Sequence, residues 1–130
     1  MSLASSLYSQ LSGYAGLTAL VSTRIYPNRA PQDATLPYVV YFRVSGSREQ
    51  AFTNAVGATG VRMQFSCFAT TYIDADAVRA QVRAALLAYT SSGGVTVHEV
   101  ALDSDLDQYE NDTFLHHCLT EAVLLVGGDL

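Results

Sequence analysis

The period of the hydrophobic pattern changes once near the middle of the chain, and this change constrains the fold more than any other feature. From residue 60 to residue 69, apolar side chains alternate with mostly polar ones, which is the period of a half-buried strand. From residue 75 to residue 89, apolar side chains recur every three or four residues, as in an amphipathic helix. A strand followed closely by a helix predicts an α+β domain.

Two helices are expected, each with recognisable ends. For the helix after residue 71, Thr71 and Asp74 resemble a capping box, with the acid near the positive end of the helix dipole, and residues 91–94 end it. An earlier helix begins after Ser2, a plausible N-cap, and ends near Gly13. Its apolar positions recur every three or four residues, as in a helix; they are Leu3, Leu7, Leu11 and Tyr14. A short turn over residues 17–21 follows.

Three further strands complete the predicted sheet. Residues 38–44 form a β-branched and aromatic run, and residues 95–106 and 113–126 read as strands joined by a polar hairpin over residues 107–112. Residues 23–37, which hold all three prolines, predict an irregular connection, and residues 45–59 predict a long hairpin loop. The expected fold is a single domain over residues 1–130, with a mostly antiparallel four-stranded sheet and two main helices packed on one face, in the order α-β-β-α-β-β.

The composition excludes several classes of protein. With 49% hydrophobic and 15% charged residues, the chain is globular and large enough to bury a core without disulfides or metals. No apolar run is long enough to span a membrane, and residues 1–14 do not resemble a secretory signal. The net charge is −5 and the seven basic residues, all arginine, are scattered, so direct or sequence-specific nucleic-acid binding is not expected.

The two cysteines, Cys67 and Cys118, each lie in an apolar strand-like run. Buried free thiols in a reducing compartment are the expected state. Neighbouring strands would also bring the two close enough for a disulfide, so that alternative stays open.

A metal site finds little support among the candidate ligands. His116 and His117 are adjacent on a strand and therefore point to opposite faces. A site made of His98, one of this pair and a carboxylate is geometrically compatible, but surface or hydrogen-bonded histidines explain the same residues. The sequence also has neither a phosphate-binding glycine loop nor a nucleophile elbow.

An acidic stretch follows in the third predicted strand. Asp103, Asp105 and Asp107 begin like a calcium loop, but Gln108 and Phe114 stand where that loop requires glycine and glutamate. The period of two instead predicts that the three carboxylates share one solvated face. Charges in this arrangement would prevent an exposed strand from pairing with another chain, or would bind a basic partner. No acid is singled out for acid–base catalysis, so enzymatic activity is not expected.

Residues 38–44 and 114–126 are apolar on both faces of their predicted strands. A sheet covered on one face only should alternate, so the second face is expected to meet another chain or, alternatively, the N-terminal helix of the same subunit.

Several motifs together resemble the phage and prophage tail-completion family. They are Arg24-Ile25-Tyr26-Pro27, Ala30-Pro31, Leu36 to Tyr41, Val61 to Ala69, Tyr72 with Asp74-Ala75, Val78-Arg79, Val82 to Leu86, Asp107 to Glu110, and His116-His117. Their order and spacing cover nearly the whole chain.

The resemblance implies a tail terminator with no cofactor and no catalytic residue. Such proteins form a ring, usually of six subunits, on the last ring of the tail tube, stop tube growth and join the tail to the head connector. The expected location is the tail–head junction of a virion assembled in a bacterial cytoplasm, with the subunit itself, the tube protein and the connector or stopper as partners and no membrane. Arg48, Glu49 and Phe52 are then candidate interface residues, since arginine and aromatic side chains dominate interface energies.

Asp103, Asp105 and Asp107 are candidates for lining a channel through which DNA passes without sticking. A head-completion stopper or adaptor protein is the first alternative function. A small ligand-binding or hydrolase domain is the second.

Overall fold

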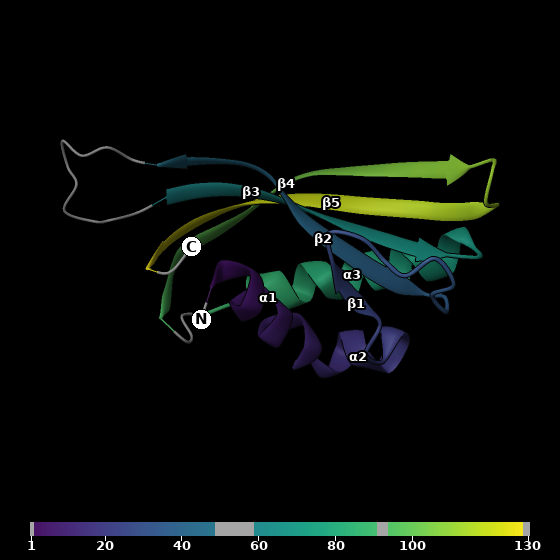
Figure 1. Ribbon diagram of the computed structural model, residues 1–130, viewed down its shortest axis with the longest axis horizontal. Helices are drawn as coiled ribbons and strands as arrows, with labels where there is room; N and C mark the ends of the chain where they lie inside the picture. The colour runs from purple at the N-terminus through teal and green to yellow at the C-terminus, as the bar shows by residue number, and fades with distance from the viewer. Residues whose placement is uncertain (1, 49–58, 91–93, 129–130) are drawn as a thin grey trace.

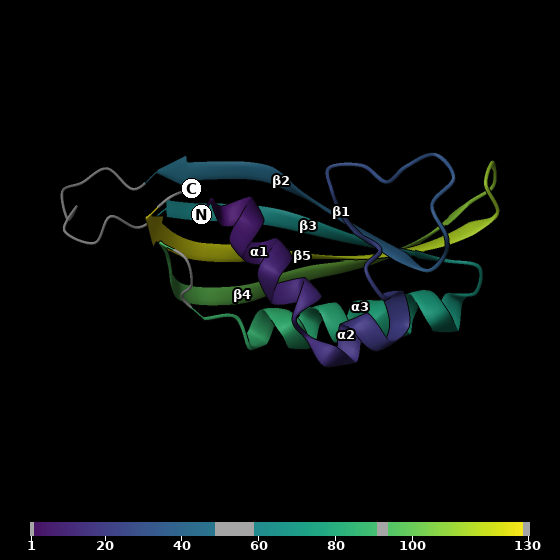
Figure 2. The same cartoon turned by 60° about the horizontal axis from the view of Figure 1, so that its bottom comes forward.

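The computed structural model describes residues 2–48, 59–90 and 94–128, and within them the chain forms three α-helices and one five-stranded sheet. The elements are α1 (Leu3–Ser12), α2 (Ala15–Val21), β1 (Ile25–Pro27), β2 (Tyr38–Arg48), β3 (Thr59–Ala69), α3 (Tyr72–Leu87), β4 (Val95–Glu110) and β5 (Leu115–Gly128). All three helices lie on one face of the sheet, below it in Figure 1 and turned toward the viewer in Figure 2. The α+β class and the placement of the helices agree with the sequence-based prediction.

The sheet has one strand more than predicted. Its order is β1-β2-β3-β5-β4, in which β1 runs parallel to β2 and every other pair is antiparallel. The prediction of a wholly irregular connection over residues 23–37 is therefore wrong, because Ile25–Pro27 pair with Val39–Tyr41. Three residues are too few to show a period of two, so only the pairing with β2 makes this segment a strand.

The helix ends follow the local sequence. The Ser2 hydroxyl accepts a hydrogen bond from the backbone N–H of Ser5 at the start of α1, which ends at the expected Gly13 cap. At the start of α3, the Thr71 hydroxyl accepts from the backbone N–H of Asp74. The short turn expected over residues 17–21 belongs to a separate helix, α2, so the prediction of two main helices omitted one of the three.

The β4–β5 hairpin is longer than predicted. β4 continues four residues past its expected end, to Glu110, whereas β5 begins at Leu115, two residues later than expected. Asp107 pairs with Cys118 and Glu110 with Leu115, so the turn takes only residues 111–114. The polar side chains of residues 107–110 suggested a loop, but the pairing of β4 with the apolar β5 extends the ladder through them.

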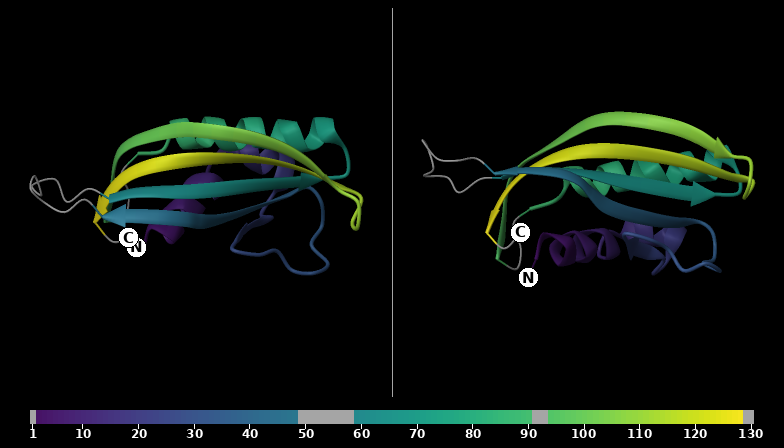
Figure 3. Two further views of the ribbon diagram at one scale, coloured as in Figure 1. Left: turned by 90° about the horizontal axis from the view of Figure 1, so that it is seen from above. Right: turned by 45° about the horizontal axis from the view of Figure 1, so that its top comes forward.

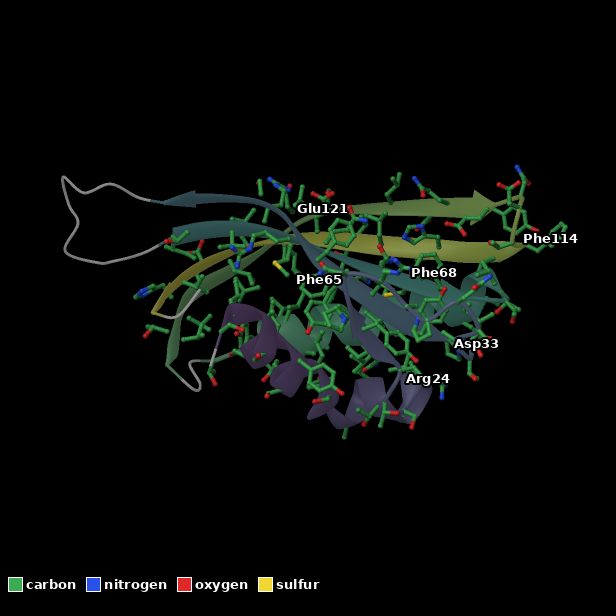
Figure 4. All side chains as sticks on the ribbon, in the orientation of Figure 1. Arg24, Asp33, Phe65, Phe68, Phe114 and Glu121 are labelled. Atoms are coloured by element: carbon green, nitrogen blue, oxygen red, sulfur yellow. The ribbon has the colours of Figure 1, made fainter. Side chains whose placement is uncertain are left out.

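The core lies between the sheet and the helices. Phe65 of β3 is fully buried there and points toward the helices, as Figure 4 shows. Leu3, Leu7 and Leu11 form the apolar stripe of α1 that packs into the same cluster. A buried hydrogen bond of 2.6 Å joins the hydroxyls of Ser6 and Tyr89, linking α1 to the end of α3. Among the described residues, no helix is long and apolar enough to cross a bilayer.

The opposite face of the sheet, which we call the outer face, is not covered by a helix of the described chain. Figure 3 shows it from above, with the strands in front of the helices. The alternative that an N-terminal helix covers this second face is therefore wrong, because α1 packs on the same side as α3. Apolar side chains on the outer face, such as Val123 and Leu125, are only half-buried.

Candidate functional site

The acidic residues of β4 do not share one face, contrary to the sequence-based prediction. A shift in register between Leu102 and Ser104 reverses the alternation there. Asp103 bonds to Arg62, on the outer face, whereas Asp105 bonds to Arg83 of α3 at 3.0 Å. Asp107 bonds to Arg79 of the same helix. A β-bulge of this kind leaves no reliable signal in the sequence, which is why the period of two misled the prediction.

Arg79 is the buried centre of this network and was not predicted as a site residue. Its guanidinium donates to Asp107 at 2.5 Å, to Asp76 at 2.6 Å and to the backbone carbonyl of Leu106 at 3.3 Å. Burial alone would lower the pKa of Arg79, but the hydrogen bonds to Asp76 and Asp107 outweigh it and raise the pKa. The network therefore fixes a charged arginine between α3 and the edge strand β4.

Asp107 has a second donor, the hydroxyl of Tyr72, at 3.0 Å. Hydrogen bonds from Arg79 and then from Tyr72 hold the pKa of Asp107 below its ordinary value. The side chains of Asp103, Asp105 and Asp107 remain 46%, 48% and 48% exposed, so each paired carboxylate still faces solvent.

Aromatic rings form a row across the outer face. Tyr38 of β2 stacks on Phe68 of β3 with centroids 5.1 Å apart, and Phe68 stacks on His117 of β5 at 4.3 Å. Tyr26 meets Tyr38 edge-on at the other end. Beside this row, the segment after β1 borders a groove of about 500 Å³, which we call the outer groove.

His117 lies in the wall of the outer groove with both ring nitrogens buried and without a hydrogen-bond partner among the described residues. Glu110 approaches its Nδ1 at 3.7 Å, which is too long for a hydrogen bond. Burial lowers the pKa of His117, and the nearby Glu110 carboxylate opposes this only in part. His116 points to the opposite face, beside Tyr72 and Tyr109, as adjacent strand positions require.

Large apolar side chains are exposed at the end of the molecule where α3 begins and the β4–β5 hairpin turns. Ile73 is 78% exposed and Phe114 is 70% exposed, and Tyr72 and Tyr109 are exposed beside them. In Figure 4, Phe114 projects from the end of the hairpin, away from the body of the molecule. The sequence analysis placed Phe114 inside the strand predicted over residues 113–126, whereas in the structure it lies in the turn before β5.

The described residues offer no metal centre. No group of three or more histidine, cysteine or acidic residues in that part of the chain, which includes His98, His116 and His117, is arranged to hold a metal ion. Cys67 and Cys118 lie opposite each other on β3 and β5 as buried free thiols, which confirms the expected state rather than a disulfide.

The residues expected at an interface fall at the edge of the described chain. Arg48 is the last residue of β2. Its side chain, Glu49 and Phe52 lie outside the described residues, so their predicted role stays a prediction.

Comparison with known proteins gives two matches of different kinds. The sequence profile of the family described as "Tail completion protein gp17" matches residues 5–123. No curated protein is significantly similar in sequence. Among solved structures, a chain of the "Virion of native gene transfer agent (GTA) particle" superposes with a TM-score of 0.76 and 20% identity, covering 98% of this chain and 96% of that one. At this identity, the structural likeness establishes a shared fold.

Proposed function

Because the chain belongs to the family of Tail completion protein gp17, we propose that it is a structural virion protein that caps the head-proximal end of a long phage tail. In this role a ring of six subunits binds the last ring of the tail tube, stops tube growth and joins the tail to the head. The family match carries the proposal, because residues 5–123 include α2, α3, β1 to β4, all but the first two residues of α1 and all but the end of β5.

The surface of the subunit supports assembly. Apolar side chains are exposed at one end, and the outer face of the sheet carries an aromatic groove without a covering helix of the described chain. Exposed apolar surface of this kind commonly marks a protein interface. The fold is also that of a protein found in a gene transfer agent virion, which is consistent with a place in a phage-like particle.

Within this proposal, Arg48, Glu49 and Phe52 contact the tail tube or a neighbouring subunit. Arg48 is the last residue of β2, and this strand ends on the side of the molecule opposite the turn of the β4–β5 hairpin, as Figure 1 shows. A Phe52→Ala variant is expected to weaken attachment to purified tails without lowering thermal stability. Equal attachment of variant and wild type would remove Phe52 from the interface.

We propose that β4 borders the DNA channel with its free edge, so that Asp103 on the outer face and Asp105 and Asp107 on the helix side all lie near the opening. Asp103, Asp105 and Asp107 are each about half exposed, although their arginine partners reduce the negative electrostatic potential that they would give to the channel wall. A weakly negative wall would let DNA slide past without binding. An Asp105→Arg variant is expected to slow DNA ejection from complemented particles, most strongly at low salt. Unchanged ejection and salt dependence would count against the channel role.

Electron microscopy of lysates tests the function itself. The gene is disrupted in its phage or prophage, and the wild-type protein is supplied in trans. We expect overlong or unjoined tails beside DNA-filled heads without the protein, and normal particles once it is supplied. Normal-length tails with empty or leaking heads would instead indicate a head-completion stopper or adaptor. Fully normal virions without the protein would overturn the structural role.

A further inference from the structure

The turn of the β4–β5 hairpin holds an aromatic side chain out into solvent. Phe114 is 70% exposed and has a φ of 58°, a left-handed conformation that non-glycine residues rarely adopt. Its backbone N–H donates to the carbonyl of Glu110 at 2.8 Å, which closes the turn. Strained backbone that displays an apolar ring suggests a binding role for the ring rather than a contribution to folding.

The same turn carries an unpaired negative charge. Asp112 is exposed and forms no ion pair with any described residue. Glu110, in contrast, is already engaged, since it accepts a hydrogen bond from the Thr113 hydroxyl and lies near His117. Residues 110–114, which we call the hairpin tip, therefore present one aromatic ring with one free carboxylate beside it.

The outer groove has the opposite character. Its wall is aromatic, with Tyr38, Phe42 and Phe68 along the outer face, and its volume of about 500 Å³ exceeds that of a phenyl ring. Arg29, on the segment after β1, lines the groove, is exposed and forms no ion pair within the described chain. His117 in the groove wall adds two ring nitrogens that have no hydrogen-bond partner among the described residues.

We propose that the hairpin tip of one subunit docks in the outer groove of a second copy of this chain. Phe114 enters between the aromatic rings, and Asp112 pairs with Arg29 of the next copy. Tip and groove are complementary in both apolar character and charge, and neither Asp112 nor Arg29 has an ion-pair partner among the described residues. This inference rests on the proposed function, because it supplies the contact between neighbouring subunits of the ring.

We infer a head-to-tail contact, in which each subunit gives its tip to one neighbour and receives the tip of another in its groove. Phe114 points away from the body of its own subunit in Figure 4, so it does not fill its own groove. The tip and the groove are different surfaces, and when each engages a different neighbour the contact repeats from copy to copy until the rotation closes a ring, whereas mutual exchange of tips would give a two-fold dimer. The half-buried apolar outer face would then be covered by the neighbouring subunit.

Photo-cross-linking tests the contact directly. Phe114 is replaced by benzoylphenylalanine in the full chain, and equal amounts of isotope-labelled and unlabelled protein are mixed to identify links between copies. The reaction is run on concentrated purified protein and on particles rebuilt by complementation. We expect mixed-isotope links to peptides of β2 and β3 that line the groove. Links to another virion protein, or no link in either sample, would overturn the proposal.

Charge reversal gives an independent measurement. We expect Arg29→Glu or Asp112→Arg alone to lower the yield of links between copies by about tenfold, equivalent to about 1.4 kcal/mol. The double variant Arg29→Glu/Asp112→Arg restores the pair with its charges exchanged and should recover most of the yield. Equal yields in all four proteins would exclude the ion pair.

The two proposals fail in distinguishable ways. If virions are normal without the protein but the purified chain still cross-links between copies, the tail role fails and the contact stands. If the protein restores tails but benzoylphenylalanine at position 114 never reaches a second copy, the contact fails and the tail role stands.

Discussion

The guanidinium of Arg79 and the carboxylate of Asp107, 2.5 Å apart, connect α3 to the edge strand β4. The arginine is buried and its partner is half exposed, so the pair marks the boundary between the core and the acidic surface of the strand. Contacts between α3 and β4 are otherwise few, which makes this network the main polar connection between the helix and the end of the sheet.

Removing this arginine should destabilise the domain. We expect Arg79→Ala to lower the free energy of unfolding by about 2 kcal/mol, because a buried charged donor with several acceptors is lost. The matched control is Arg83→Ala, whose pair with Asp105 is exposed and should contribute less than about 1 kcal/mol. Urea denaturation of the three proteins measures the difference. Equal losses for the two variants would contradict the central role of Arg79.

The cysteines should be inert in the native protein. Burial raises the pKa of Cys67 and raises that of Cys118 to about 11, so neither is a thiolate near neutral pH. We expect an aromatic disulfide reagent to detect no thiol in the folded protein and both thiols in denaturant. A single rapidly reacting thiol before unfolding would show that one of the two positions opens to solvent.

Stability should decrease in mild acid through His117. Its pKa in the folded protein lies below the ordinary value of 6.5, so the unfolded chain takes up the proton first as the pH falls. The stabilisation is therefore complete above about 6.5 and is lost as the pH falls toward the pKa of the folded state. Chemical denaturation at several pH values should show a flatter profile for His117→Phe, which keeps the ring stacked on Phe68.

The matched control for this measurement is His98→Phe, at an exposed position on β4. Identical pH profiles for wild type and His117→Phe would show that His117 does not titrate differently in the two states.

Two phenylalanines should respond oppositely to truncation. Phe65→Ala removes a fully buried core ring and is expected to cost about 3–5 kcal/mol of unfolding free energy. Phe114→Gly relieves a left-handed residue that contributes little packing, and should raise stability by up to about 1 kcal/mol. Thermal unfolding of both variants provides the comparison. A clear loss of stability in Phe114→Gly would mean that the exposed ring supports the fold.

Local patterns in the sequence determined the central elements of this protein. The alternation over residues 60–69 predicted β3, and the helical spacing after Thr71 predicted α3 with its cap. Both predictions depend on interactions within a few residues, namely the alternation of side chains along a strand and a hydroxyl that caps nearby backbone N–H groups. The same reasoning placed Ser2 and Gly13 at the ends of α1.

Tertiary structure decided the features that pairing between distant segments creates. Ile25–Pro27 become a strand only because β2 lies beside them, and the bulge after Leu102 directs Asp103 away from Asp105 and Asp107. The outer groove likewise joins residues of the segment after β1 to Phe68 and His117. Register and bulges depend on how a whole strand fits its neighbour, so the charge and shape of the surfaces arise only when the sheet is assembled.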